Sequence, residues 1–155
     1  MNALHLEELN AGNVAAANTL SLKPGQDQFV APVSHSIAEA YVNQESTWPR
    51  VAVDGDTVVG FLMGNFDEDA ENELFRATIL RMNVDGDHQR QGVGTFLVNA
   101  LADEARSRGI DEITAGWEEG ELGPGQFFRH LGFVEVGETE YGETIGKLTV
   151  QVHAQ

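Results

Sequence analysis

The stretch Gln89-Arg90-Gln91-Gly92-Val93-Gly94-Thr95 separates an apolar run at residues 79–84 from a strongly periodic segment. In that segment apolar residues recur at spacings of three and four, which line one face of an α-helix: Val93, Phe96, Leu97, Ala100, Leu101 and Ala105. A strand that turns through glycines into a helix presents unpaired backbone N–H groups and the positive end of a helix dipole. Residues 89–95 therefore predict a phosphate-binding turn.

Two common phosphate motifs do not fit this turn. A P-loop requires a lysine before its final serine or threonine, and no lysine is present here. A Rossmann turn requires a third glycine, but Leu97 stands at that position. Glu112 lies at about the distance expected of a ribose-binding acid, yet it precedes the next apolar run instead of following it. The Rossmann interpretation is therefore disfavoured.

A third motif, Q/R-x-x-G-x-G/A, is matched by Gln89, Gly92 and Gly94. Downstream, residues 127–133 read FFRHLGF, which is similar to the pattern F-Y-x-x-L-G-F. Both patterns, with their spacing, resemble the GNAT superfamily of acetyl-CoA-dependent N-acyltransferases over roughly residues 3–152. The resemblance implies one N-acetyltransferase domain over residues 1–155 and the activity of an acyltransferase.

The order of predicted elements agrees with an α/β GNAT fold. That fold is a mixed, mostly antiparallel twisted sheet with flanking helices and a central, splayed pair of parallel strands. We expect strands or strand pairs at residues 4–9, 51–63 (a hairpin around Asp54-Gly55-Asp56), 74–84, 110–117, 133–136 and 145–152. We expect helices from about residue 13 to 20, from about Ser36 to 43, after the glycine turn, and at 125–131, with Trp48-Pro49 ending the second helical region.

Charge and composition limit the function. The 155 residues include 25 acidic and 9 basic side chains, giving a formal net charge of −16, and no cysteine. Such a surface repels nucleic acid, and the chain has neither a cysteine nucleophile nor a thiolate metal site. Because no apolar run approaches a membrane span and Met1–His5 lacks a leader pattern, we expect a cytoplasmic protein without a membrane partner. The acidity indicates either salt adaptation or a polycationic substrate.

The resemblance implies how the co-substrate acetyl-CoA is bound, without a metal. Backbone N–H groups of about Gln91 to Thr95 would hold the pyrophosphate of coenzyme A, assisted by the charge of Arg90. The pantetheine arm would pair with the backbone of the preceding strand, where a bulge separates it from its parallel neighbour. These contacts, together with aromatic packing, give the following expected cofactor-binding set: Met82, Asn83, Val84, Gln89, Arg90, Gln91, Gly92, Val93, Gly94, Thr95, Phe127 and Phe128.

The catalytic residues are less defined. An alkyl amine needs a base, and Glu118 and Glu119 end the strand that follows the phosphate-binding helix. The family's usual acid is the tyrosine of F-Y-x-x-L-G-F, which is Phe128 here, so we expect slower turnover or replacement by Tyr141. We expect His130 to be a solvated helix residue.

Residues 24–41 resemble the acceptor region of the spermine/spermidine (diamine) acetyltransferase-like branch. That resemblance implies a small polyamine-like amine as acceptor, with Asp27, Phe29 and Glu39 in the acceptor wall. Three alternatives stay open: a peptide or protein amine, an aminoglycoside, and an acyl-CoA-binding module that has lost turnover. The edge of the terminal hairpin also suggests a homodimer.

Overall fold

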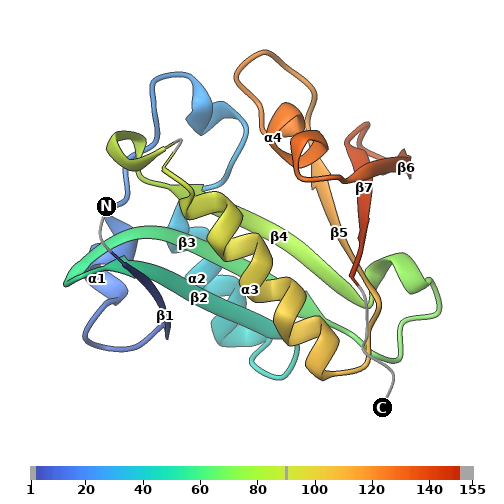
Figure 1. Ribbon diagram of the computed structural model, residues 1–155, viewed down its shortest axis with the longest axis horizontal. Coiled ribbons are helices and arrows are strands. Elements are labelled where there is room, and N and C mark those ends of the chain that lie inside the picture. Colours follow the sequence, from blue (N-terminus) through green and yellow to red (C-terminus); the bar gives the residue numbers. More distant parts are fainter. Residues whose placement is uncertain (1–2, 90, 151–155) are drawn as a thin grey trace.

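The computed structural model describes residues 3–89 and 91–150, which form one seven-stranded sheet in the order β1-β2-β3-β4-β5-β7-β6 (Figure 1). The strands are β1 (Leu4–Glu8), β2 (Thr47–Asp54), β3 (Thr57–Phe66), β4 (Ala77–Val84), β5 (Glu112–Trp117), β6 (Val134–Glu138) and β7 (Thr144–Thr149). Neighbouring strands are antiparallel except for the parallel pair β4–β5. The expected mixed α/β fold is confirmed.

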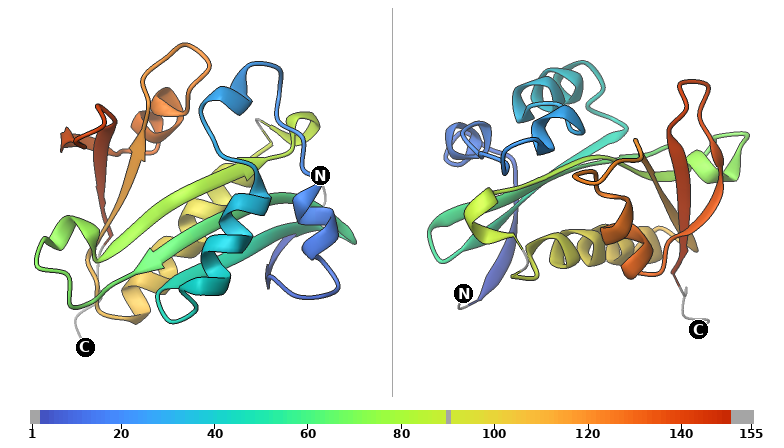
Figure 2. Two further views of the ribbon diagram at one scale, coloured as in Figure 1. Left: turned by 180° about the vertical axis from the view of Figure 1, so that it is seen from behind. Right: turned by 90° about the horizontal axis from the view of Figure 1, so that it is seen from above.

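Helices cover both faces of the sheet (Figure 2). They are α1 (Val14–Asn18), α2 (Val33–Val42), α3 (Val93–Ser107) and α4 (Gly125–His130), with short 3₁₀ turns η1 (Gln26–Gln28), η2 (Glu73–Phe75) and η3 (Gly86–His88). The larger core lies under α3, whose buried face includes Val93, Leu97 and Leu101. A smaller core under α1 and α2 contains Phe61 and Met63 of β3. The periodic face read from the sequence is therefore the face that packs on the sheet.

Two strand boundaries differ from expectation for local reasons. Trp48 and Pro49 lie within β2 and do not end the helical region. β1 pairs only with residues 50–54, so at Pro49 strand β2 has a neighbour on one side only, where a missing N–H is tolerated. β4 begins at Ala77, not at Leu74, because the Asn72 side chain accepts from Leu74 N–H at 3.0 Å and caps η2.

The parallel pair is short. β4 and β5 pair only at Thr78–Thr114 and Ile79–Ala115. On its other side, β4 passes from Ile79 opposite Gly64 to Arg81 opposite Met63, so Leu80 is an extra residue, a β-bulge. Beyond the bulge β4 stays paired with β3 while β5 diverges towards α4, as Figure 1 shows. The predicted splay between the parallel strands is confirmed.

Within the described ranges, none of the helices combines the length and the apolar character that crossing a bilayer demands.

Candidate active site

The open side of β4 offers backbone hydrogen-bonding groups to the gap. Asp85 N–H donates to the Val59 carbonyl at 3.0 Å, directly after the pair Gly60–Val84. In an antiparallel ladder, alternate residues direct both backbone groups towards the partner strand. Asp85 and Asn83 therefore bond towards β3, and the N–H and C=O groups of Met82 and Val84 point to the side from which β5 has diverged.

Asn83 has a different place from its two neighbours. Its backbone faces β3, and its side chain is 3% exposed and donates from Nδ2 to the Ala31 carbonyl at 3.2 Å. Asn83 therefore joins the segment before α2 to β4, while Met82 and Val84 present backbone to the gap.

The glycine turn forms the N-terminus of α3 next to this gap. Gly92 adopts the left-handed conformation with φ +86°, and the first helical bond runs from Phe96 N–H to Gly92 C=O at 2.9 Å. The N–H groups of Val93, Gly94 and Thr95 precede that bond and have no partner within the helix. No side chain of the described residues caps this end of α3. The turn therefore has the free amides and the positive dipole end that bind an anion.

Gly94 also permits close packing between α3 and α4. A methyl group at this position would lie 2.9 Å from the Phe127 ring and 3.4 Å from the Met82 side chain. The amides of the turn can thus approach the gap only because residue 94 has no side chain.

A cleft of about 560 Å³ connects the turn with the gap. Its walls are mainly apolar, and none of the described residues that line it carries a carboxylate. The lining residues are Leu22, Gln26, Phe29, Val30, Met82, Val84, Gln89, Gly92, Gly94, Thr95, Leu122, Gly123, Pro124, Phe127 and His130. Apolar walls, the open backbone edge of β4 and a helix N-terminus suit the pantetheine arm and the diphosphate of acetyl-CoA.

Eight of the residues expected at the site line this cleft: Phe29, Met82, Val84, Gln89, Gly92, Gly94, Thr95 and Phe127. Gln91 is exposed and donates to the Asp87 carbonyl at 3.4 Å, and the Val93 side chain is 1% exposed in the core. Arg90 lies outside the described residues.

Phe128 does not line the cleft. Its ring is 4% exposed, stacks on Trp117 with centroids 5.3 Å apart, and meets Phe133 edge-on at 5.2 Å. The α-helical rotation between neighbouring residues turns Phe127 to the cleft and Phe128 to the core.

The two carboxylates at the end of β5 differ. The Glu119 carboxylate accepts from Arg129 Nη2 at 2.8 Å and from the Trp117 indole N–H, and Arg129 also binds Glu135 at 2.7 Å. The hydrogen bond from Arg129, followed by that from Trp117, lowers the pKa of Glu119 below its usual 4.5, which makes it a weaker base. Glu118 is exposed, and its backbone carbonyl adjoins Gly123 in the cleft wall.

The other expected residues do not line the cleft. Tyr141 is 84% exposed at the β6–β7 turn and does not line it. Asp27 is exposed in η1, between Gln26 and Phe29. Glu39 on α2 accepts from Arg81 on β4 at 2.6 Å.

Several cleft residues gave no signal in the sequence. Leu22, Val30 and Leu122 come from loops that meet only in the folded chain. A methyl group at Gly120 would lie 2.6 Å from the Phe29 ring, and one at Gly25 would lie 2.5 Å from Leu122. His130 is exposed at the cleft wall, and its spacing of three from Phe127 could have identified it.

Comparison with known proteins agrees with this geometry. The model of the acetyltransferase (GNAT) family matches residues 18–133, which is well over half of the chain. A search of curated proteins finds no match.

Solved structures share the fold over nearly their whole length. The Escherichia coli ribosomal-protein-S18-alanine N-acetyltransferase aligns with a TM-score of 0.70 and 20% identity over 99% of this chain and 97% of that chain. An aminoglycoside 6'-N-acetyltransferase complexed with coenzyme A aligns with a TM-score of 0.71 and 17% identity, over 97% of this chain and 99% of that chain. The PaiA N-acetyltransferase of Thermoplasma acidophilum, in complex with coenzyme A, aligns with a TM-score of 0.68 and 13% identity, over 95% of this chain and 99% of that chain. With the family match over residues 18–133, the chain belongs to the acetyltransferase (GNAT) family and is an acetyl-CoA-dependent N-acetyltransferase.

Proposed function

We propose that this cleft binds acetyl-CoA and that the enzyme acetylates a small primary amine of the polyamine type. The proposed binding of acetyl-CoA is supported most by one observation: the open edge of β4 lies beside the N-terminus of α3, which no described side chain caps. Met82 and Val84 direct backbone groups into the gap, and the glycine turn ends within the same cleft.

The roles follow from the groups that the chain presents. The N–H groups of Val93, Gly94 and Thr95 hold the diphosphate, and the charge of Arg90 adds to their attraction. The backbone of Met82 and the N–H of Val84 pair with the amides of the arm, since the Val84 carbonyl already accepts from Gln89 Nε2, and Phe127 packs against the arm. Acetyl-CoA, when bound, supplies a thioester carbonyl to the attacking amine. A backbone N–H of the open edge stabilises the negative charge that develops on that oxygen.

The chain must also take a proton from the acceptor. An alkyl amine with a pKa near 10.4 is only about 0.1% neutral near pH 7.4, which is equivalent to roughly 4 kcal/mol. We assign the base to Glu118, because the Glu119 carboxylate is bound by Arg129 and Trp117. Since Glu118 does not line the cleft, it takes the proton through water. Tyr141 lies at the exposed turn, so we propose that coenzyme A departs as the thiolate, without an acid from the protein, because a thiol has a pKa near only 8.5.

The polyamine part is supported by charge near the cleft. Asp27 stands exposed between Gln26 and Phe29, which both line the cleft, so its carboxylate can meet a distal ammonium group. Glu39 is already paired with Arg81. Of the two carboxylates expected in the acceptor wall, Asp27 is therefore the one we assign to the acceptor.

Release of free thiol from acetyl-CoA across a panel of amines tests this function. The panel contains spermidine, putrescine, an aminoglycoside, and peptides with a free α-amine or lysine, because structural neighbours carry peptide-type and aminoglycoside activities in their names. The proposal expects the highest kcat/KM with a polyamine and a lower one after Asp27→Asn. Preference for a peptide or an aminoglycoside would overturn the acceptor class, and binding of acetyl-CoA without turnover of any amine would identify a silent module.

A further inference from the structure

Gln26 and Gln89, 63 positions apart in the chain, form a reciprocal pair of side-chain amides in the cleft wall. Gln26 Nε2 donates to Gln89 Oε1 at 3.0 Å, and Gln89 Nε2 donates to Gln26 Oε1 at 2.7 Å. Both side chains are partly buried. Two hydrogen bonds between the same two amides fix their planes relative to each other, which one bond would not do.

Each amide also has a backbone partner. Lys23 N–H donates to Gln26 Oε1 at 3.1 Å, and Gln89 Nε2 donates to the Val84 carbonyl at 3.0 Å. Reversing either amide would place like atoms against each other at these contacts. The network therefore has a single arrangement, with Gln26 held by its own turn and Gln89 held by the end of β4.

This arrangement affects the proposed cofactor site because Gln89 connects the end of β4 with the glycine turn. Val84 directs its carbonyl into the gap beside β4, and Gln89 is the first residue of the anion-binding turn. By binding that carbonyl, Gln89 determines where the chain leaves β4 and enters the turn. Gly86 N–H also donates to the Ser21 carbonyl at 2.6 Å. Residues 21–26 therefore contact the connection 84–89 at two separate points, Ser21–Gly86 and Gln26–Gln89.

We infer that Gln26 is a positioning residue for acetyl-CoA binding, acting through Gln89 on the turn at residues 89–95. The inference rests on the proposed binding of acetyl-CoA in this cleft. Gln26 holds the Gln89 amide in the orientation that spans from η1 to Val84, and so it keeps the amides of the turn in place before the diphosphate arrives. Loss of such preorganisation lowers affinity without removing a contact to the ligand.

The test measures coenzyme A affinity by calorimetry and steady-state kinetics for Gln26→Met. The matched control is Gln28→Met, which makes the same change in the same 3₁₀ turn at an exposed side chain with no hydrogen bond among the described residues. We expect Gln26→Met to weaken coenzyme A binding and raise the acetyl-CoA KM by about 5- to 30-fold, the effect of one or two hydrogen bonds. We expect kcat at saturating acetyl-CoA and the melting temperature to stay within error of those of Gln28→Met.

A double-mutant cycle with Gln89→Met separates positioning from a general effect on the fold. If Gln26 acts through Gln89, adding Gln26→Met to Gln89→Met causes no further loss of affinity. Equal affinities of Gln26→Met and Gln28→Met, or additive losses in the cycle, would overturn the inference while leaving the proposed function intact. Failure of the unsubstituted protein to bind coenzyme A would instead overturn the proposed function, and the inference with it.

Discussion

Phe127 and Phe128 are adjacent in the chain and their rings meet edge-on with centroids 5.3 Å apart, but the two rings have different surroundings. Phe127 lines the cleft, and Phe128 stacks between Trp117 and Phe133. A hydroxyl group at residue 128 would therefore enter the aromatic core, where burying it without a partner costs roughly 1–3 kcal/mol.

We expect Phe128→Tyr to lower the free energy of unfolding by about this amount and to leave kcat no higher than before, as urea unfolding and thiol release would measure. Phe75→Tyr is the control, because the Phe75 side chain in η2 is 45% exposed and its added hydroxyl group would meet solvent, at a smaller cost in stability. A large gain in kcat for Phe128→Tyr would show that residue 128 reaches the reacting sulfur, contrary to the packing described here.

The Glu119 carboxylate provides a pH-dependent contact. Because Arg129 and then Trp117 lower its pKa below 4.5, the contact stabilises the fold above pH 4.5 and is lost as the pH falls through the lowered pKa. We therefore expect Glu119→Gln to lower the melting temperature at pH 7 and to match the unsubstituted protein at lower pH. Glu118→Gln is the matched control, and a Glu119→Gln deficit that persists unchanged at low pH would contradict this account.

Among the elements, the junction of β4, α3 and α4 depends on Gly94. An alanine there would place its methyl group 2.9 Å from the Phe127 ring, so the ring or the first turn of α3 must shift at the cleft wall. Overpacking of this kind costs about 1–3 kcal/mol, and here it falls on the proposed cofactor site.

We expect Gly94→Ala to weaken coenzyme A binding by about tenfold or more, measured by calorimetry. Gly137→Ala on β6 is the control, because a methyl group there has no neighbour within 4 Å among the described residues. Unchanged affinity for Gly94→Ala would mean that the diphosphate does not approach this junction.

The sequence predicted those elements whose signals are local. The glycine turn at Gly92 that opens α3, the periodic face of α3 and the hairpin around Gly55 each occupy one short segment, and all three are found in the structure. The extent of β4 was overestimated because the Asn72 cap on η2 is a single side-chain contact that periodicity does not reveal.

The remainder of the cleft could not be predicted for a physical reason. Phe29 and Leu122 contact glycines of the opposite loop, and Gln26 meets Gln89 across 63 positions. Such contacts depend on how the sheet brings distant loops together, and neither hydrophobic period nor motif spacing carries that information. Adjacent residues such as Phe127 and Phe128 differ only through helical rotation, which a motif alignment ignores.

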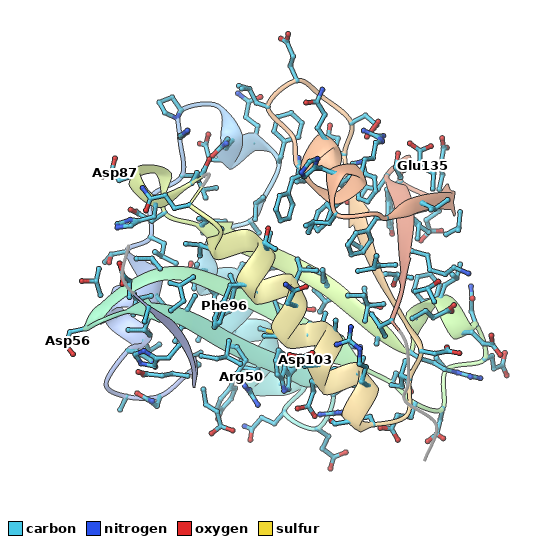
Figure 3. The ribbon with its side chains drawn as sticks, in the orientation of Figure 1. Arg50, Asp56, Asp87, Phe96, Asp103 and Glu135 are labelled. Atoms are coloured by element: carbon cyan, nitrogen blue, oxygen red, sulfur yellow. The ribbon has the colours of Figure 1, made fainter. Side chains whose placement is uncertain are left out.

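At the scale of the whole molecule, the net charge of −16 is spread over the surface. Figure 3 labels Asp56 in the hairpin turn, Asp87 in η3, Asp103 on α3 and Glu135 on β6, which are four separate elements. Carboxylates distributed in this way repel one another, and salt screens that repulsion over a Debye length of about 10 Å at 0.1 M.

We therefore expect the melting temperature to rise by a few degrees as sodium chloride increases from about 10 mM to about 0.5 M. For a chain of this length, a gain of about 1 kcal/mol in the free energy of unfolding raises the melting temperature by about 2–4 °C. Potassium chloride should give the same rise, because screening does not distinguish these cations. A melting temperature that is flat or falls with both salts would contradict self-repulsion as a property of this fold.

The cleft between β4, α3 and α4 is the proposed site of acetyl-CoA. Calorimetric titration at neutral pH with coenzyme A and with acetyl-CoA tests it directly. We predict saturable binding of both at one site per chain, weakened by Gly94→Ala and unchanged by Gly137→Ala. No detectable association with either ligand, or equal affinities of the two alanine variants, would contradict it.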